Sequence, residues 1–498
     1  MEKTNGTEGA VKYISLDRKQ LRWEALDLEH LIPEDHSARI IWEVSERLDV
    51  SRFEEEQKTR EGNAGRPCWP ARLLVSVWVY SYTMGVASAR AMERMMSHEP
   101  GLRWLAADER INYHTLASFR VGHKEALEDL FAQFLALLEA AEMVDLSTLL
   151  HDGTKVRAVA GSGSFHRRKS LEKRLRQARK VVRELDRQAA ENDALDERRR
   201  AAQARAAREA LARAQTALQK LRQLETVPAP GPGAELRVSG SEPEARKMKH
   251  ADGARAPSYN VQVSTEAQSR MIVGIGVTTA ANDTQELMPA LEKVKQNCGE
   301  LPSMIIADNG YATRSNVEQT SEQHIDLIAP WKEDRSREAG ACARNGIATE
   351  FAPSAFRVQR GGQSLICPAG KSLVFIQQKI HHGVLRSMFE ARQSDCEQCR
   401  WHRQCCGKRG GPRRMERVEE SPAMKQYLAR MKRPEVRKLY RKRSEVAEFP
   451  HLWIKGLKKW RRFSVRGLVK AGMEAVWVAL SYNMTQWIRL QQAVPAAA

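Results

Sequence analysis

The spacing of apolar residues changes along the chain, and each change indicates a different kind of element. From residue 23 to about 145, apolar residues recur with helical spacing, most clearly over 71–86 and 125–144. Residues 165–225 keep a still more regular helical spacing among many charges, which predicts an antiparallel helical hairpin. After the Pro/Gly-rich stretch 227–235 the period shortens to two, which is typical of strands. We therefore expect a multidomain α+β protein.

The helical N-terminal part contains one stretch with a possible link to DNA. Residues 88–120 predict a short helix, a break that contains Gly101, and a second helix that opens near Asn112 or Thr115. This order resembles a helix-turn-helix, whose second helix can enter a major groove. Most helix pairs of this kind are packing units, so packing remains the alternative interpretation.

The strand-like region predicts a specific sheet. Its segments, in order, are a strand at 149–158, a hairpin at 258–279, a helix at 283–297 with Asp283 as its N-cap, and strands at 303–311 and 324–330. With the helical hairpin set aside as an insertion, this is the order of a ribonuclease-H-like mixed five-stranded sheet with helices on its faces. In that order the first and fourth strands are neighbours.

Each of those two neighbouring strands is apolar and ends in an aspartate. Asp152 ends "LLHD" before Gly153, and Asp308 ends "IIAD" before Asn309 and Gly310. Two carboxylates held side by side repel each other unless cations lie between them, and hard divalent ions with oxygen ligands remove that cost. A pair of such ions can cleave a phosphodiester. The ordinary alternative is that each aspartate only forms a turn; His151 is expected to be a structural neighbour in its strand.

The composition indicates which partner and which compartment to expect for the protein. The chain has 498 residues, enough for two to four domains, and its 81 Lys and Arg against 62 Asp and Glu give a net charge of +19. Such an excess favours a nucleic-acid partner, the alternative being a basic surface without a ligand. No apolar stretch approaches the roughly 20 residues that cross a bilayer, and the N-terminus lacks the pattern of a secretory signal. We expect no membrane contact and a cytoplasmic protein.

The cysteines and the basic segments predict two further sites. Four thiols with knuckle-like spacing suit a structural Zn²⁺, with Cys406 or His402 able to replace one of them: Cys367, Cys396, Cys399 and Cys405. Reduced cysteines without metal are the alternative, and Cys68, Cys298 and Cys342 are expected to be ordinary thiols. Residues 400–417 and the segment "KKWRRF", with Lys459, Arg461 and Arg462, fit phosphate contact, unless they are merely solvated charges.

Several motifs in order resemble a DDE-type transposase of a bacterial insertion sequence, in the group numbered eleven eighty-two within the four-and-five assemblage. They are "DGTKVRA", "SEPEARKMK", "YNVQV", "ADNGY", "CPAGK", "CEQCRWHRQC", "YRKRSEVAE" and "IKGLKKWRRFSVRGL". The stretch 65–95 also resembles the helical domain of that group. A single short motif would be common by chance, whereas an ordered series over 300 residues is not.

The resemblance implies a catalytic triad of Asp152, Asp308 and Glu448, which would bind two Mg²⁺ ions, with Mn²⁺ able to substitute. It also implies that Tyr440, Arg443 and Lys455 contact the phosphates of the transposon end. The sequence departs from the group in "EFPHLWIK", where a proline and then Phe-Gly more often follow the glutamate. Pro450 fits the first turn of a helix only if the helix begins at Glu448 or Phe449, and Glu445 is the alternative third carboxylate.

The resemblance also implies a cut-and-paste transposase that binds the terminal inverted repeats, cleaves at each end and joins the freed 3′ hydroxyl to target DNA. Because two ends are processed together, a homodimer on DNA is expected. Its location would be the cytoplasm, with the bacterial nucleoid. The helical hairpin is either an oligomerisation arm or a spacer. A non-catalytic DNA-binding descendant and a stand-alone nuclease are the alternatives. The expected divisions are a disordered tail at 1–22, a helical DNA-binding domain at 23–145, a catalytic core at 146–340 interrupted by the hairpin and linker at 165–230, a cysteine-rich basic insertion at 341–430, and C-terminal core helices at 431–498.

Overall fold

The structure is a computed structural model that describes residues 19, 25–55, 67–191, 197–226, 236–331, 335–359, 362–381, 384–441, 443–457 and 460–493. Apart from Lys19, the expected tail of residues 1–22 lies outside this part, and so does the whole of the linker at 227–235.

The N-terminal part is helical, as the apolar spacing predicts. It contains short 3₁₀ turns at Glu29–Leu31 and Ser51–Phe53 and the helices α1 (Ser37–Glu46), α2 (Ala71–Thr83), α3 (Ala89–Met95), α4 (Pro100–Leu105), α5 (Tyr113–Gly122) and α6 (Lys124–Ala140). The side chain of Asn112 caps α5 by accepting from the Thr115 amide at 3.0 Å. The expected break at Gly101 is wrong, because Pro100 begins a further short helix there.

The central sheet is mixed and has six strands: β1 (Thr148–Arg157), β4 (Arg246–Lys249), β5 (Arg255–Glu266), β6 (Ile272–Thr278), β7 (Met304–Ala307) and β8 (Asp326–Ile328). β5 lies antiparallel to β1, and β6 pairs with its other edge. β1 and β7 are parallel neighbours, as predicted, and β8 follows β7 in parallel. The strand beyond the expected five is β4, which pairs with the start of β5. The helices α9 (Leu287–Cys298) and α10 (Arg314–Glu322) connect β6 to β7 and β7 to β8.

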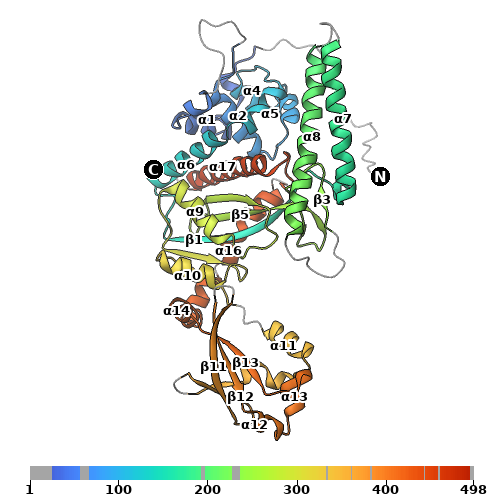
Figure 1. Cartoon of the computed structure of the whole chain (residues 1–498). Coiled ribbons are helices and arrows are strands. Elements are labelled where there is room, and N and C mark those ends of the chain that lie inside the picture. Colours follow the sequence, from blue (N-terminus) through green and yellow to red (C-terminus); the bar gives the residue numbers. More distant parts are fainter. Residues whose placement is uncertain are drawn as a thin grey trace, which may run out of the picture.

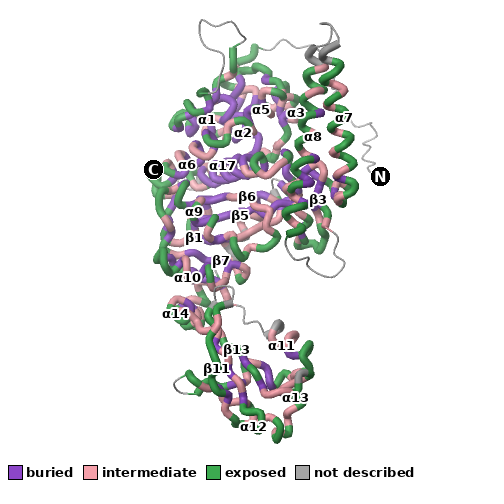
Figure 2. Tube along the Cα trace, in the orientation of Figure 1, coloured by how far each residue is buried: buried purple, intermediate pink, exposed green. Residues whose placement is uncertain are grey.

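The long helix α17 (Leu468–Ala493) lies between the N-terminal helices and the sheet (Figure 1). Its Trp477 and the α2 residue Trp78 are both fully buried, and Figure 2 shows α2 and α17 as largely buried. The Asn483 side chain accepts from the Ile272 amide and donates to its carbonyl, each at 2.8 Å, which ties α17 to β6. The helices and the sheet therefore share one hydrophobic core. No helix in the described ranges is both long enough and apolar enough to span a bilayer.

The charged segment after β1 forms a long hairpin of two helices, α7 (Arg168–Glu191) and α8 (Glu197–Glu225), which projects along one side of the molecule (Figure 1). The ion pair between Arg168 and Glu225 joins the start of α7 to the end of α8, so the helices are antiparallel. At the hairpin base, a 3₁₀ turn (Ser162–Ser164) precedes β2 (Phe165–His166), which pairs with β3 (Val238–Ser239). The small core of this region contains Leu171, Leu218 and Leu221.

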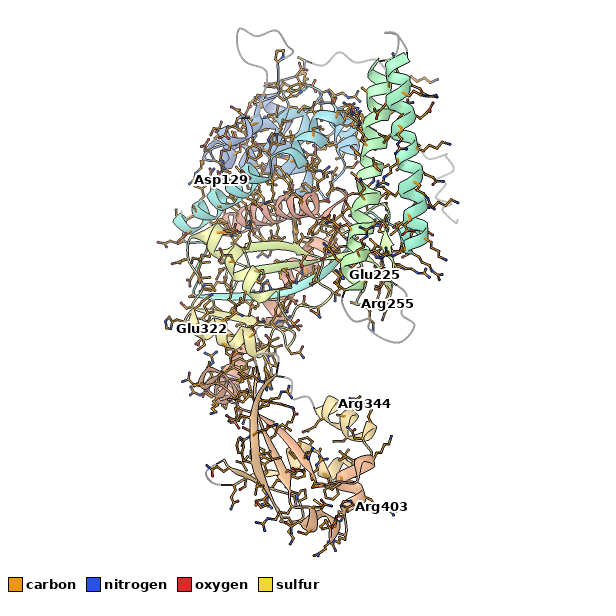
Figure 3. The ribbon with its side chains drawn as sticks, in the orientation of Figure 1. Asp129, Glu225, Arg255, Glu322, Arg344 and Arg403 are labelled. Carbon is orange, nitrogen blue, oxygen red and sulfur yellow. The ribbon has the colours of Figure 1, made fainter. Side chains whose placement is uncertain are left out.

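The cysteine-rich segment forms a separate antiparallel sheet at the far end of the molecule (Figure 1), hereafter the outlying sheet. Its strands are β9 (Arg357–Val358), β10 (Ser364–Ile366), β11 (Ser372–His381), β12 (Val384–Ala391) and β13 (Arg414–Val418). Beside them lie α11 (Arg335–Arg344), α12 (Gln393–Glu397), α13 (His402–Cys406) and 3₁₀ turns at Thr349–Phe351, Pro353–Ala355 and Gly407–Arg409. This part has a small core of its own, which contains Phe351, Phe356, Leu365, Leu373 and Phe389. Figure 3 places Arg344 and Arg403 on this outlying part.

The chain then returns to the central sheet through α14 (Pro422–Met431), α15 (Pro434–Arg441) and α16 (Arg443–Leu452). α16 begins at Arg443, so Pro450 lies inside the helix and outside its first turn. A proline there removes one backbone hydrogen bond, and the helix continues as a wider π turn at Trp453–Leu457. α16 packs against β1.

Candidate active site

The parallel pairing of β1 and β7 brings Asp152 and Asp308 together. The expectation that Asp152 ends its strand is wrong, because β1 continues to Arg157 through its pairing with β5, whereas Asp308 directly follows the end of β7. The parallel pairing of these strands runs to His151 opposite Ala307, so the two aspartates are the next residue on each strand. Adjacent strands are about 5 Å apart. The apolar residues before the aspartates, Leu150 and Ile306, are buried and hold both strand ends in the core. The predicted convergence of these two positions is therefore observed in the backbone register.

The Asp152 carboxylate lies in a crowded, partly buried position. Its pKa is raised to about 6: burial is the largest cause, the charge of Arg443 opposes it, and the negative charges of Asp308 and Asp283 add to it. Nη2 of Arg443 lies 3.1 Å from Oδ1 of Asp152, and the Gly153 amide donates to the same oxygen at 2.9 Å. The site thus concentrates negative charge and already attracts a cation.

The glycine after Asp152 makes this crowding possible. A Cβ atom at Gly153 would lie 2.6 Å from Oδ1 of Asp283, 2.7 Å from Nε2 of Gln262 and 2.9 Å from the Tyr311 hydroxyl. All three are shorter than an ordinary van der Waals contact. Only glycine therefore lets these polar groups approach the backbone of β1 so closely at this position.

Asp283 has a different role from the one predicted. The helix α9 begins at Leu287 with Glu286 as its N-cap, so Asp283 is not the cap. Its Oδ1 instead accepts from Nδ2 of Asn260 at 2.7 Å and from Nε2 of Gln262 at 2.8 Å. These two donors point from β5, and they hold a third described carboxylate beside the strand ends.

His151 is a buried structural residue, as predicted. One ring nitrogen lies 2.9 Å from Oγ of Ser264 and the other 2.9 Å from Oε1 of Gln262. Burial lowers the pKa of His151 to about 4, so the ring is neutral at pH 7.

α16 and the π turn carry two basic residues that lie near Asp152. Arg443 begins the helix and reaches Oδ1, and Lys455 in the π turn donates to Oγ1 of Thr154 and, at 3.0 Å, to the Lys155 carbonyl. Burial lowers the pKa of Lys455 to about 8. Position 448 lies on α16 one turn before His451, but the side chains of Glu448 and Glu445 lie outside the described part. The third carboxylate stays a prediction.

His451 is a site residue that the sequence analysis did not select. Its Nε2 lies 3.6 Å from Oδ2 of Asp152, and both ring nitrogens are shielded from solvent without a hydrogen-bond partner. Burial and the charges of Lys455 and Arg443 lower the pKa of His451 to about 3, so the ring is neutral and this contact is not an ion pair. The only signal in the sequence is its spacing, three residues after Glu448 and four before Lys455.

The other residues expected to contact DNA lie near the site or beyond the described part. Tyr440 is half-buried and packs near Leu150 and Ile306, whereas Arg461 and Arg462 are exposed, and Arg462 forms a single β-bridge with Arg157. Lys459 lies outside the described residues.

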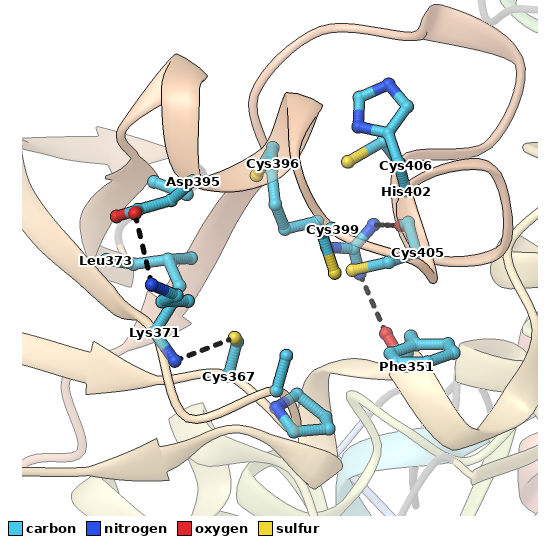
Figure 4. A pocket seen from close by; sticks show the side chains of 14 residues that line it. Phe351, Cys367, Lys371, Leu373, Asp395, Cys396, Cys399, His402, Cys405 and Cys406 are labelled. Carbon is cyan, nitrogen blue, oxygen red and sulfur yellow. Dashed lines mark hydrogen bonds and ion pairs between the residues drawn. The ribbon is translucent and has the colours of Figure 1, made fainter.

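The four predicted zinc-binding thiols, Cys367, Cys396, Cys399 and Cys405, line one small cavity of about 30 Å³ beside the outlying sheet, together with His402 and Cys406 (Figure 4). The Lys371 amide donates to Sγ of Cys367 at 3.3 Å. Burial raises the pKa of Cys405, and the neighbouring thiols Cys396, Cys367 and Cys399 raise it further.

Within the described ranges, no three His, Cys, Asp or Glu side chains are close enough to hold a metal ion. The eight cysteines are all free thiols, among which Cys68 is exposed, Cys298 half-buried and Cys342 buried.

Comparison with known protein families matches two segments of the chain. Residues 26–122 match the Transposase domain (DUF772), and residues 366–488 match the Transposase DDE domain. No match is found among curated proteins. The DDE match includes α16 and the cysteine cavity, whereas β1 and β7 precede it.

The two matches support a DDE-type transposase, a class that acts on DNA and generally uses divalent metal ions.

Proposed function

We propose that the chain is a cut-and-paste transposase of a bacterial insertion sequence, in the group numbered eleven eighty-two. It binds the terminal inverted repeats of its element and hydrolyses a phosphodiester at each end. It then joins the freed 3′ hydroxyl of each end to target DNA. The observation that carries this proposal is the parallel register of β1 and β7, which leaves Asp152 and Asp308 side by side under α16.

We further propose that the central sheet is ribonuclease-H-like. The strand order β6-β5-β1-β7-β8 supports this assignment, with β5 antiparallel to its neighbours and β7 and β8 parallel to β1. β4 is then an extension of the fold, and the α7–α8 hairpin is an insertion between β1 and β5 along the chain.

Asp152, Asp308 and Glu448 are the residues that would hold two Mg²⁺ ions, or Mn²⁺ in their place. The fit rests on oxygen ligands, which hard divalent ions prefer, and on the neighbouring carboxylates Asp308 and Asp283, whose charges add to the effect of burial in raising the pKa of Asp152. When bound, the two ions activate the attacking oxygen and stabilise the leaving one. The protein's own part is to hold both carboxylates on two paired strands of one sheet, which requires little rearrangement during the reaction.

The basic residues around this site are proposed to hold the DNA backbone: Tyr440, Arg443, Lys455, Lys459, Arg461 and Arg462. Arg443 and Lys455 flank Asp152 on α16 and the π turn, and Arg461 and Arg462 are exposed beside the end of β1. The N-terminal helices, with α5 as the candidate recognition helix, read the terminal repeats. Two ends must be processed together, so the active form is a homodimer on DNA.

The cysteine cavity is proposed to bind a structural Zn²⁺ through Cys367, Cys396, Cys399 and Cys405. Two features support it: the thiols line one cavity from separate elements, and a backbone amide already donates to Sγ of Cys367.

A strand-transfer assay on DNA that carries the ends of the element tests the function. Asp152→Asn, Asp308→Asn and Glu448→Gln should each lower cleavage and strand transfer by at least about 1,000-fold, since each removes a metal-binding charge, while DNA binding is retained. The matched control is Asp252→Asn, which removes an exposed carboxylate and should leave activity unchanged.

Three outcomes would contradict the proposal. Full activity in the triad variants would remove these residues from the active site. Cleavage of any DNA, without dependence on the element ends, would indicate a nuclease. Specific binding of the ends without Mg²⁺-dependent products in the wild type would indicate a DNA-binding protein without catalysis.

A further inference from the structure

His451 has the properties of an unused ligand. Its ring faces the Asp152 carboxylate, with Nε2 at 3.6 Å from Oδ2, and neither ring nitrogen has a hydrogen-bond partner or access to solvent. Buried polar atoms normally find a partner, and one that does not calls for an explanation such as an ion. We propose that His451 is a nitrogen ligand of the divalent metal ion that Asp152 binds. This inference rests on the proposed function, because it assumes a metal ion at Asp152.

The distance between the two groups fits ligands of one ion better than a hydrogen bond. At 3.6 Å, Nε2 and Oδ2 are too far apart for a hydrogen bond. Two ligands at about 2.1 Å from an octahedral ion are about 3 Å apart at a right angle, and farther apart at wider angles. Arg443 contacts the other carboxylate oxygen, Oδ1, so Oδ2 remains for the ion that His451 would share.

The side chains of His151 and Lys455, which also lie near Asp152, are already engaged. Both ring nitrogens of His151 lie at hydrogen-bond distance from β5 side chains, Ser264 and Gln262. The Lys455 ammonium has three donors and no lone pair while it is charged, and it donates to Thr154 and to the Lys155 carbonyl. His451 is therefore the nitrogen in this group that can bind a metal without first breaking a contact.

Two ligands do not complete a metal site. In the described part of the chain, no third ligand is within range of the same ion, so Asp308 has to turn toward it or α16 has to supply Glu448. An imidazole ligand also changes the choice of metal. Mg²⁺ strongly prefers oxygen, whereas first-row transition ions accept nitrogen, so His451 favours Mn²⁺ over Mg²⁺.

Pulsed electron paramagnetic resonance on the full-length protein with bound Mn²⁺ tests this inference directly. A nitrogen ligand produces a ¹⁴N modulation of the Mn²⁺ signal, and labelling the histidines with ¹⁵N should replace it by the ¹⁵N pattern in the wild type. His451→Gln should remove the modulation and weaken Mn²⁺ binding by at least about tenfold. His98→Gln, which changes an exposed histidine on an N-terminal loop, should do neither.

The outcomes separate this inference from the proposed function. If Mn²⁺ binds and Asp152→Asn abolishes the binding, but the wild type shows no histidine nitrogen, His451 is not a ligand and the proposed function still stands. An unchanged modulation in His451→Gln would have the same meaning. If Asp152→Asn leaves Mn²⁺ binding intact, the metal site itself is wrong and both proposals fail. The isotope comparison needs no substitution, so it holds even if His451→Gln folds poorly.

Discussion

At the scale of single residues, the candidate site depends on how closely polar groups approach β1 at Asp152 and Gly153. Asp152 lies beside Asp308 and Asp283, and the donors that satisfy Asp283 come from β5. Gly153 stands at the centre of this group and contributes no side chain. The absence of a Cβ atom there is therefore a requirement of the site as well as of the turn.

Gly153→Ala should lower the free energy of unfolding by about 1–3 kcal/mol and abolish cleavage. The new methyl group would lie 2.6 Å from Asp283 and 2.7 Å from Gln262, so the hydrogen bonds between them must break or move. Denaturant unfolding measures the first effect and the end-cleavage assay the second. The matched control is Gly276→Ala on β6, where a Cβ atom would meet nothing within 4 Å. Equal stability and activity of the two variants would contradict this account.

The residues of the site differ in how far the sequence could predict them. Asp152 and Asp308 follow from local pattern plus strand order, because each ends an apolar run and parallel strands end at one edge. Asp283 was assigned to a helix cap from its position alone, but its partners on β5 are distant in sequence. His451 could not be selected from sequence, because the burial of its ring depends on how α16 lies on β1.

At the scale of elements, the least predictable part is the outlying sheet. Its strand β11 exposes Val374, Phe375, Ile376 and Ile380, so the alternation that marks a half-buried strand is weak there. The cysteines were the stronger signal, and they lie in the loops and short helices beside the strands. The place of Pro450 within α16 is also beyond the sequence, because a proline alone does not fix where a helix starts.

Removal of the proposed Zn²⁺ should unfold the outlying sheet and leave the central sheet intact. The outlying sheet has its own small core, which a tetrahedral ion would close against α12 and α13. Elemental analysis should find about one zinc per chain in the wild type and almost none in Cys396→Ser, whereas Cys68→Ser, the control, keeps it.

Hydrogen exchange supplies the second measurement. Chelation or Cys396→Ser should remove the protection of β10 to β12 while β5 and β6 stay protected. Purified wild-type protein without zinc, with normal protection of the outlying sheet, would contradict the assignment.

At the scale of the whole molecule, the N-terminal helices and the central sheet are one structural unit. α17 is the last described helix, yet it packs against α2, α6 and β6. The helical part expected from the sequence as a separate DNA-binding domain is therefore joined to the central sheet by packing. Apolar spacing along one helix cannot reveal this, because α17 is apolar on most faces and its two partners are far away in sequence.

A buried polar link in that unit runs through Arg120, and its loss should weaken the helices and the sheet together. Nη1 of Arg120 donates to the Tyr82 hydroxyl at 3.3 Å and to Oγ of Ser464 at 2.9 Å, and Ser464 in turn donates to the buried carboxylate of Glu474. Arg120→Ala leaves Glu474 without a compensating charge and should cost about 3–5 kcal/mol.

If the shared core makes these parts one cooperative unit, hydrogen exchange in Arg120→Ala should accelerate equally in α2 and in β6. The outlying sheet should keep its protection, because it has a core of its own. Arg94→Ala, which removes an exposed arginine from α3, should change neither region. Loss of protection confined to α2 would mean that the N-terminal helices open independently of the sheet. Coupling between them matters for the proposed function, since a rigid connection lets binding of a terminal repeat by the helices fix the position of the scissile phosphate at Asp152.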